Sequence, residues 1–542
     1  MKRIGLVVLL ALGVACESAI GSVRVASVYL ESFAALQTQA EQAAQIFESP
    51  EIGTLPMMMQ MMVPGLSQID RDAPVALHIY SDGAEKYSVV LDIKPAVSAE
   101  NFLAALVAAQ GGHVPDAVDG RFVTEQGAAQ VHGDRLLLGQ QAADLDVSVV
   151  IGIPAEMPGI AGLLRLDAAP ATLAKMLDGF AEMLMQTLPA DDEHRAMFRN
   201  MIKFYRAGLE QVAIYQSGIG VTGSGLEIRG KIVPQAGRAL AGIVQSLQGV
   251  DAAWLSQLNR GNLFGAVSGA YTIPEGVLAS FVDLYIDMLR SVPDGAELDP
   301  ELMRAMFEPS IASAGAPSFL FAGLREGSGK LDLSGGMLVA DAASVLKRMM
   351  ALVGSDAYQQ LMAKSGMAVS GPVERLVNGH TVYRWSMTWD GESLRDQMGH
   401  TGAPGMGADE MATFTRVLEA LLGGYDYAAT DKGMVFGITD DAGIIQAMQL
   451  LDAGGQRMAA PNPVLARMGV STAPYAVARL DLLGMLKLVS RLTPSGAAFA
   501  QIESHSVGIQ FTGWRSGDAI EQMITIPASD IRAMRKTVQA MQ

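Results

Sequence analysis

The sequence predicts an α+β fold in which antiparallel sheets carry helices mainly on one face, arranged as two pseudo-repeated halves. Three observations lead to this prediction. Short segments of alternating apolar residues are interrupted by glycine turns, which is typical of β-hairpins. Each hairpin is followed by apolar residues spaced three and four apart, which indicates an amphipathic helix. This hairpin-helix unit occurs four times along the chain, and such recurrence predicts internal repeats.

The first hairpin-helix unit follows residue 74. Its strands are expected over 75–80 and 89–93, with a turn at 81–83. Ser98 stands just before the next apolar face, where its hydroxyl can accept a hydrogen bond from the first helical turn. A helix packed against the hairpin is therefore expected after Ser98, because the sheet is the natural place to bury its apolar face.

The other three units repeat this order. Their strands are expected over 219–222 and 226–233, over 319–324 and 331–339, and over 507–514 and 520–526. Their helices are expected over 240–247, after a cap at Asp341, and after a cap at Ser529. A serine or aspartate oxygen at the cap binds an otherwise unpaired amide of the first turn.

A second element, a short apolar strand before a helix, lies between these units. It is clearest at 164–167 before 173–184, and at 478–481 before 485–492. Interleaving the two elements divides the chain into two α+β halves, 16–250 and 251–542. A signal segment over 1–15, described below, precedes them. The second half contains extra helical segments near 301–311 and 356–363. A duplicated ancestor explains this order, and chance recurrence of hairpins in an α+β chain remains the alternative.

The amino-terminal segment has the composition of a secretory signal peptide. Lys2 and Arg3 precede an apolar run over 4–15, and Cys16 follows it. The run is shorter than the roughly 20 apolar residues that span a bilayer. We therefore expect an exported protein.

Cys16 is the only cysteine in the chain. The residues before it resemble a lipobox, the motif at which a bacterial signal peptidase cuts just before a diacylated cysteine. The match departs from the pattern at Gly13, where leucine is usual. This resemblance implies a lipoprotein on the periplasmic side of the outer membrane. Cleavage after Ala15 without acylation, which leaves a soluble periplasmic protein, is the alternative.

The charge balance restricts the possible partners. The formal net charge is −17, and loss of Lys2 and Arg3 with the signal takes it to −19. Nucleic acid is excluded, because phosphates require a basic face. The negative charge also disfavours adsorption to anionic lipid, so contact with the membrane is expected through the lipid anchor or through apolar surface.

The chain contains no motif that identifies an enzyme. Gly218, Gly220 and Gly223 match a dinucleotide-binding pattern, but the residues that follow alternate as a strand, so they are interpreted as hairpin glycines. No G-x-S-x-G elbow or H-E-x-x-H helix is present. The seven histidines are scattered, and each is interpreted as hydrogen-bonded or solvated. No cofactor, metal or catalytic residue is assigned, and whether the protein is an enzyme stays open, with a non-enzyme favoured.

The most unusual local feature is a methionine cluster. It consists of Met57, Met58, Met59, Met61 and Met62. Methionine packs adaptably against apolar surfaces of varied shape, so a contact surface is the favoured interpretation. Copper(I) ligation by the soft thioethers is the alternative.

Taken together, these features predict a cell-envelope protein without a catalytic site that binds an apolar ligand or a protein partner. Two alternatives remain. A hydrolase could assemble its site from scattered residues, and a structural envelope component would need no site. An enzyme should contain converging acids or histidines in a cleft, whereas a ligand binder should contain an apolar pocket.

Overall fold

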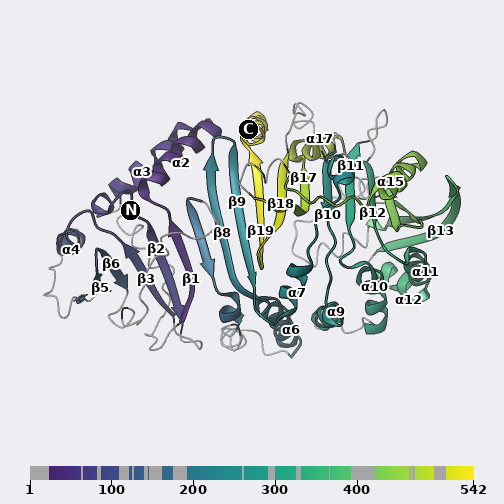
Figure 1. Ribbon diagram of the computed structural model, residues 1–542, viewed down its shortest axis with the longest axis horizontal. Helices are drawn as coiled ribbons and strands as arrows, with labels where there is room; N and C mark the ends of the chain where they lie inside the picture. The colour runs from purple at the N-terminus through teal and green to yellow at the C-terminus, as the bar shows by residue number, and fades with distance from the viewer. Residues whose placement is uncertain are drawn as a thin grey trace. The chain divides into compact units, whose positions relative to one another are not determined.

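Figure 1 shows the helices and strands of the computed structural model. The chain divides into two compact units. Unit 1 comprises Met1–Ala241 and Ala519–Arg532, and unit 2 comprises Gly242–Asp518 and Ala533–Gln542. The structure describes residues 23–62, 65–81, 87–108, 121–124, 127–139, 145, 162–174, 177, 192–258, 262–290, 299–324, 331–364, 366–391, 415, 419, 423–462, 466, 470–492 and 508–541.

Unit 1 contains an antiparallel sheet. Its strands are β1 (Val23–Leu30), β2 (Val75–Ser81), β3 (Tyr87–Ile93), β4 (Arg121–Thr124), β5 (Gly127–His132), β6 (Arg135–Gly139), β7 (Leu164–Ala168), β8 (Val212–Thr222), β9 (Gly225–Pro234) and β19 (Ala519–Pro527). Their pairings give the order β4-β5-β6-β3-β2-β1-β7-β8-β9-β19. The last strand therefore comes from a distant part of the sequence, and Ile526 pairs with Leu226.

The helices of unit 1 connect these strands. They are α2 (Phe33–Ile46), α3 (Pro50–Met62), the 3₁₀ helix η1 (Leu66–Gln68), α4 (Ala99–Ala108), α6 (Asp192–Leu209) and α7 (Ala239–Ser246), which contains the division between the units. Ser32 caps α2, because its Oγ accepts from the Ala35 amide at 3.0 Å. Helix α2 packs on β8 and on α3. A core under these helices includes Phe33, Phe102 and Leu136.

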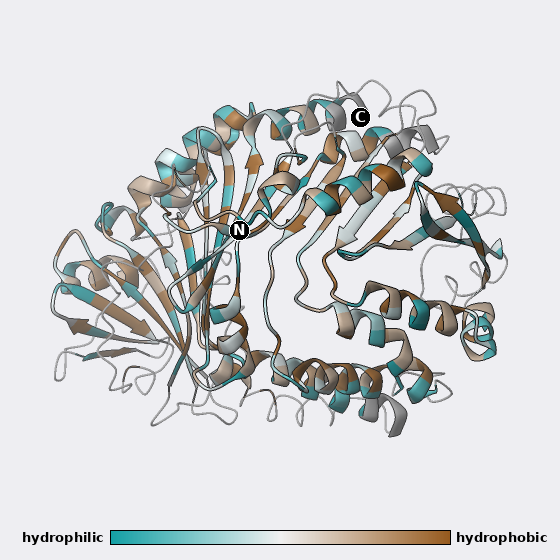
Figure 2. Ribbon diagram, turned by 45° about the vertical axis from the view of Figure 1, so that its right-hand side comes forward, coloured by the Kyte–Doolittle hydropathy of each residue, from teal (hydrophilic) through white to brown (hydrophobic). Residues whose placement is uncertain are grey.

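Unit 2 is likewise built on antiparallel strands. Its strands are β10 (Phe264–Ser268), β11 (Ser318–Leu324), β12 (Leu331–Met337), β13 (Met367–Val377), β14 (His380–Trp389), β15 (Gly424–Ala429), β16 (Met434–Ile438), β17 (Pro474–Leu480) and β18 (Ile509–Ser516). Their pairings give the order β13-β14-β15-β16-β12-β11-β10-β17-β18. In Figure 2, apolar brown segments run along strands, whereas the helices alternate between brown and teal.

The helices of unit 2 alternate with strands along the sequence. They are α8 (Ala252–Leu255), α9 (Val277–Arg290), α10 (Pro300–Ser313), α11 (Ala342–Val353), α12 (Asp356–Lys364), α15 (Asp441–Ala453), α17 (Leu482–Leu492) and α18 (Ala528–Met541), in which the second division between the units falls. Helix α15 packs on β12 and β16, and α11 packs on β15. The main core surrounds Trp254, whose ring centroid lies 5.0 Å from that of Phe319.

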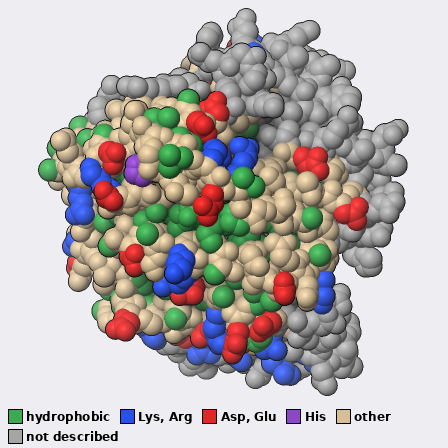
Figure 3. Space-filling model, turned by 90° about the vertical axis from the view of Figure 1, so that its right-hand side faces the viewer, with side chains coloured by type: hydrophobic (Ala, Val, Ile, Leu, Met, Phe, Trp, Pro, Cys, Tyr) green, Lys and Arg blue, Asp and Glu red, His purple; other side chains and the backbone are tan. Residues whose placement is uncertain are grey.

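Strand β13 lies at an edge of the unit 2 sheet. It exposes 66% of Val373 and 75% of Leu376, between which stand the charged residues Glu374 and Arg375. A β-bulge interrupts its register between Ser370 and Val373. Charges and bulges of this kind hinder pairing with a further strand. Figure 3 shows that acidic, basic and apolar side chains are interspersed on this side of the molecule.

The mixed α and β content predicted from the sequence is confirmed. The hairpins of β2 with β3, β8 with β9 and β11 with β12 lie where they were expected. Strands are also present where the fourth pair was expected, as β18 and β19, and a helix follows the second strand of each of the four pairs. Gly218 and Gly220 lie within β8 and Gly223 lies in the turn to β9, so the hairpin interpretation of these glycines is confirmed.

The assigned caps were right in two of three cases. The Ser98 and Asp341 side chains accept from the Asn101 and Ser344 amides. The cap at Ser529 is wrong, because α18 begins at Ala528 and the Ser529 hydroxyl donates to Asp530 instead. The helix follows Pro527 directly, so the cap assigned from residue type alone was placed two residues too late.

Candidate functional site

The methionine cluster lies on α3. Pro50 begins this helix. Proline is well suited to this position, because the first amide of a helix has no hydrogen-bond partner within the helix. Within α3 the side chains of Met57, Met58 and Met59 are between 42% and 58% exposed, and that of Met61 is 81% exposed. The side chain of Met62 lies outside the described residues. An apolar surface is thus open to solvent on a helix whose single ionisable residue is Glu51.

Helix geometry spreads these thioethers around α3. Successive residues are turned by about 100°, so Met57, Met58 and Met59 point in different directions. Gly53 faces α2, where an added β-carbon would lie 3.4 Å from the Ala44 side chain. Met57 follows Gly53 by about one helical turn and so lies near the side of α3 that packs on α2, whereas Met58 and Met59 are turned well away from it. This arrangement suits a broad apolar contact surface better than a single metal centre.

A second feature is a buried polar cluster in unit 1, formed by Ser27, His78, Asp92 and Arg135. Ser27 Oγ lies 2.7 Å from His78 Nδ1, and His78 Nε2 lies 3.8 Å from Asp92 Oδ2. Arg135 Nε donates to Asp92 Oδ1 at 2.5 Å. The first three side chains are fully buried. The register explains their proximity, since Ser27 pairs with His78, and Asp92 pairs with Ala76 two residues from His78.

This cluster contains the residue types of a serine hydrolase, which the sequence did not reveal. Catalysis would require a serine that substrate can reach and amide donors for the oxyanion. Ser27 instead lies in the middle of β1 with no solvent exposure. His78 Nε2 and Asp92 Oδ2 have no hydrogen-bond partner among the described residues. The geometry therefore fits a buried polar network better than an active site.

A related ion-pair network lies in unit 2 around the fully buried Asp426 of β15. Arg375 donates to Asp426 Oδ1 through Nη1 at 2.5 Å and to Asp441 Oδ1 through Nε at 2.9 Å. The hydrogen bond with Asp426 raises the pKa of Arg375 above its usual value. Because Asp441 begins α15, the arginine joins the edge strand β13 to that helix. This network thus links β13, β15 and α15.

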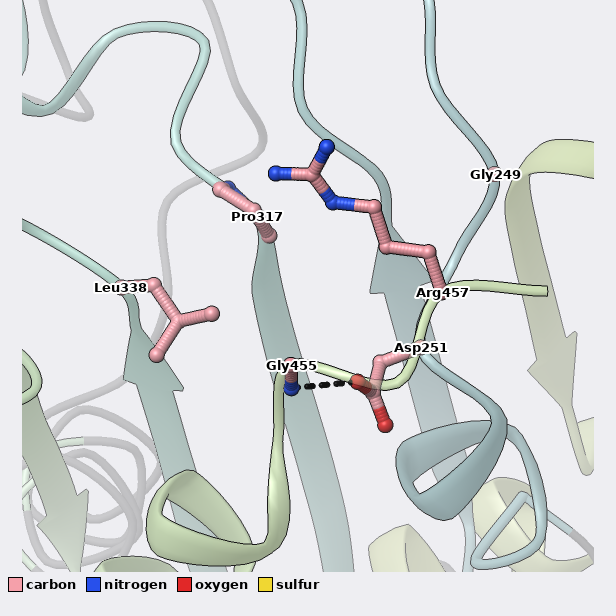
Figure 4. A pocket seen from close by; sticks show the side chains of 6 residues that line it. All are labelled: Gly249, Asp251, Pro317, Leu338, Gly455 and Arg457. Carbon is pink, nitrogen blue, oxygen red and sulfur yellow. Dashed lines mark hydrogen bonds between the residues drawn. The ribbon is translucent and has the colours of Figure 1, made fainter.

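A pocket of about 280 Å³ lies in unit 2 (Figure 4). It is lined by Gly249, Asp251, Pro317, Leu338, Gly455 and Arg457. Asp251 is 3% exposed and caps α8, since its Oδ1 accepts from the Ala253 amide at 2.9 Å. Its Oδ2 accepts from the Gly455 amide at 2.7 Å. Sequence reasoning missed these residues, because an isolated arginine and a capping aspartate have no distinctive pattern.

The structure adds nothing to the predicted lipidation site, and the described residues contain no metal site. Cys16 lies outside the described residues. Within the described part of the chain, no group of three His, Cys, Asp or Glu residues could hold a metal ion. None of the helices described there is long and apolar enough to cross a membrane.

Comparison with protein-family models, with curated proteins and with solved structures finds no match to this chain. Its function therefore has to be argued from its own residues.

Proposed function

We propose that this protein is an exported, lipid-anchored cell-envelope protein that binds a protein partner through the methionine surface of α3 and has no catalytic role. The observation that carries the proposal is the solvent exposure of Met57, Met58, Met59 and Met61 on one short helix. A helix that is apolar over most of its circumference is normally covered. We define the α3 methionine surface as these four side chains.

The chemistry of this surface indicates the kind of partner. Helix α3 has only Glu51 as an ionisable residue, so charge pairing cannot provide much of the attraction. The net charge of −17 disfavours an anionic lipid surface as the occupant. Methionine side chains adapt to apolar surfaces of different shape. An uncharged, apolar face of another protein is therefore the best complement.

The lipid anchor is proposed from Cys16. It directly follows the apolar leader, and no other cysteine exists in the chain. Mass spectrometry of the mature amino terminus tests the proposal. We expect a diacylated cysteine at residue 16 and a membrane-associated protein. An unmodified terminus together with recovery in the soluble fraction would disprove the anchor and leave the partner proposal to its own test.

We propose that the two halves of the chain, 16–250 and 251–542, are copies of one ancestral segment. In the first half the order is strand, two helices, hairpin, helix, three strands, and then strand, helix, hairpin, helix, from β1 to α7. The same order runs from β10 to α18, with α12, β13 and α15 as additions. The order supports equivalence of β9 and β19, since each ends a hairpin that leads into a helix. Closely superposable backbones in an experimental structure would be the expected result.

The partner proposal is tested with matched substitutions. A photo-crosslinking residue at position 61 should capture one defined envelope protein, whereas the same residue at exposed Gln45 on α2 should not. Exchange of Met57 and Met58 for glutamine should abolish this crosslink. Exchange of both for leucine should preserve it, because leucine keeps the apolar surface at similar volume. Equal crosslinking in both variants would contradict the proposal.

The hydrolase alternative rests on the buried polar cluster. A reactive serine would be labelled by a serine-directed phosphonate probe, and Ser27→Ala would prevent that labelling. We expect no labelling of the wild-type protein at Ser27, because this residue is fully buried.

A further inference from the structure

The pocket of unit 2 is lined by two charged side chains, those of Asp251 and Arg457. Both Asp251 carboxylate oxygens are occupied, Oδ1 by the amides of α8 and Oδ2 by Gly455. Pro317 and Leu338 supply apolar walls. The Arg457 side chain is exposed and forms no hydrogen bond or ion pair with any residue that the structure describes. The pocket thus combines apolar walls with an available cation.

The backbone that carries Arg457 is held in place. Asp251 and Arg457 form a β-bridge. The Met458 amide donates to the Val250 carbonyl at 2.9 Å, and the Ala252 amide donates to the Gln456 carbonyl at 3.1 Å. These bonds on both sides of Arg457 fix the position from which its side chain extends.

Gly249 permits this close approach. An added β-carbon there would lie 2.4 Å from the Met458 carbonyl oxygen, so only glycine fits beside the loop. Gly455, with φ of +113°, takes a backbone conformation that other residues rarely adopt. In Figure 4 the guanidinium of Arg457 extends toward Pro317, across the pocket from the Asp251 carboxylate, which is turned to Gly455. The cation and the apolar wall therefore face the same space.

We propose that this pocket binds a small monocarboxylate with a short apolar body. A guanidinium pairs with a carboxylate through two parallel hydrogen bonds, and Pro317 and Leu338 would contact the apolar part. The pocket volume of about 280 Å³ corresponds to roughly nine water molecules at about 30 Å³ each, which suits an acid such as hexanoate. A single cation favours one negative charge over a phosphate dianion. The proposal is independent of the α3 methionine surface.

Titration calorimetry of the mature chain with hexanoate tests this site, with hexanol as the uncharged comparison. We expect a dissociation constant of about 1 mM or below for hexanoate, and binding of hexanol at least about tenfold weaker. Arg457→Gln should weaken hexanoate binding by about tenfold or more and leave hexanol unchanged. Arg457→Lys keeps the charge without the planar fork and should be intermediate.

Lys536→Gln removes an exposed cation that does not line the pocket, so it should leave hexanoate binding unchanged. Thermal unfolding of each variant establishes that the fold is intact, which is expected because Arg457 is exposed. The proposal is overturned if the wild type shows no saturable binding up to about 10 mM, if hexanol binds as tightly as hexanoate, or if Arg457→Gln binds hexanoate like the wild type.

Discussion

Gly225 shows how a single residue controls the hairpin of β8 and β9. Its φ is +149°, and an added β-carbon would lie 2.0 Å from the Ile526 carbonyl oxygen of β19. Neighbouring Gly223 has open space around it. A β-carbon therefore fits at residue 223 of this turn but not at residue 225.

We expect Gly225→Ala to destabilise the protein by about 1–3 kcal/mol, because it forces β9 away from β19 and strains the backbone. Gly223→Ala is the matched control and should change the free energy of unfolding by less than about 0.5 kcal/mol. Urea denaturation measures both. Equal effects would mean that the close contact with Ile526 does not restrict residue 225.

Arg135 neutralises a fully buried carboxylate in the polar cluster of unit 1. It donates to Asp92 and also to the Pro74 carbonyl. Arg135→Met should therefore cost about 3–5 kcal/mol of stability, because a buried charge is left without its partner. The Asp92→Asn, Arg135→Met double variant should recover part of this loss. Arg304→Met, which breaks an exposed ion pair with Asp283, should have little effect.

Tyr427 provides a test of stability at alkaline pH. Burial, and to a lesser extent Tyr425 and Tyr358, raise its pKa to about 12. The unfolded chain releases this proton near pH 10, so the contribution of Tyr427 to stability should be full below pH 10 and fall as the pH rises toward 12. Between pH 9 and 11 the wild type should lose about 1 kcal/mol more than Tyr427→Phe. The same exchange at exposed Tyr205 is the control.

At the scale of single elements, α3 allows the choice between contact surface and copper site to be tested. Met58→Leu with Met62→Leu nearly conserves side-chain volume, so stability should change by less than about 1.5 kcal/mol. Partner binding should persist, because leucine preserves the apolar surface. A tight copper(I) complex of the wild type that is lost in this variant would instead favour metal binding.

Elements could be predicted from the sequence where a local pattern determines them. The hairpin of β2 and β3 follows from alternation and a turn, and Asp341 caps α11 as its position implied. Strand β8 begins at Val212, seven residues before the predicted strand, because the apolar alternation of that stretch is weak. The buried polar cluster could not be predicted, since Ser27, His78 and Asp92 meet only through the pairing register of β1, β2 and β3.

At the scale of the whole molecule, each unit is built from two separate segments of the chain, whereas the sequence predicted a single boundary at residue 250. Residues 519–532 belong to unit 1, although the rest of unit 1 ends at Ala241. No local pattern in β19 identifies β9 as its partner, because strand pairing over such a separation depends on the assembled sheet. The pocket was likewise invisible in the sequence, since Asp251, Leu338 and Arg457 come from three separate stretches of the chain.

The pairing of β9 with β19 sets the order in which unit 1 can be completed. A ribosome delivers the chain from its amino terminus, so Gly225–Pro234 is available long before Ala519–Pro527. During that interval the side of β9 that later pairs with β19 carries unpaired amides and carbonyls, which can pair with other chains. Unit 1 is therefore completed only after residues 242–518 of unit 2 have been synthesised, and the nascent chain must keep a long strand edge from aggregating until β19 arrives.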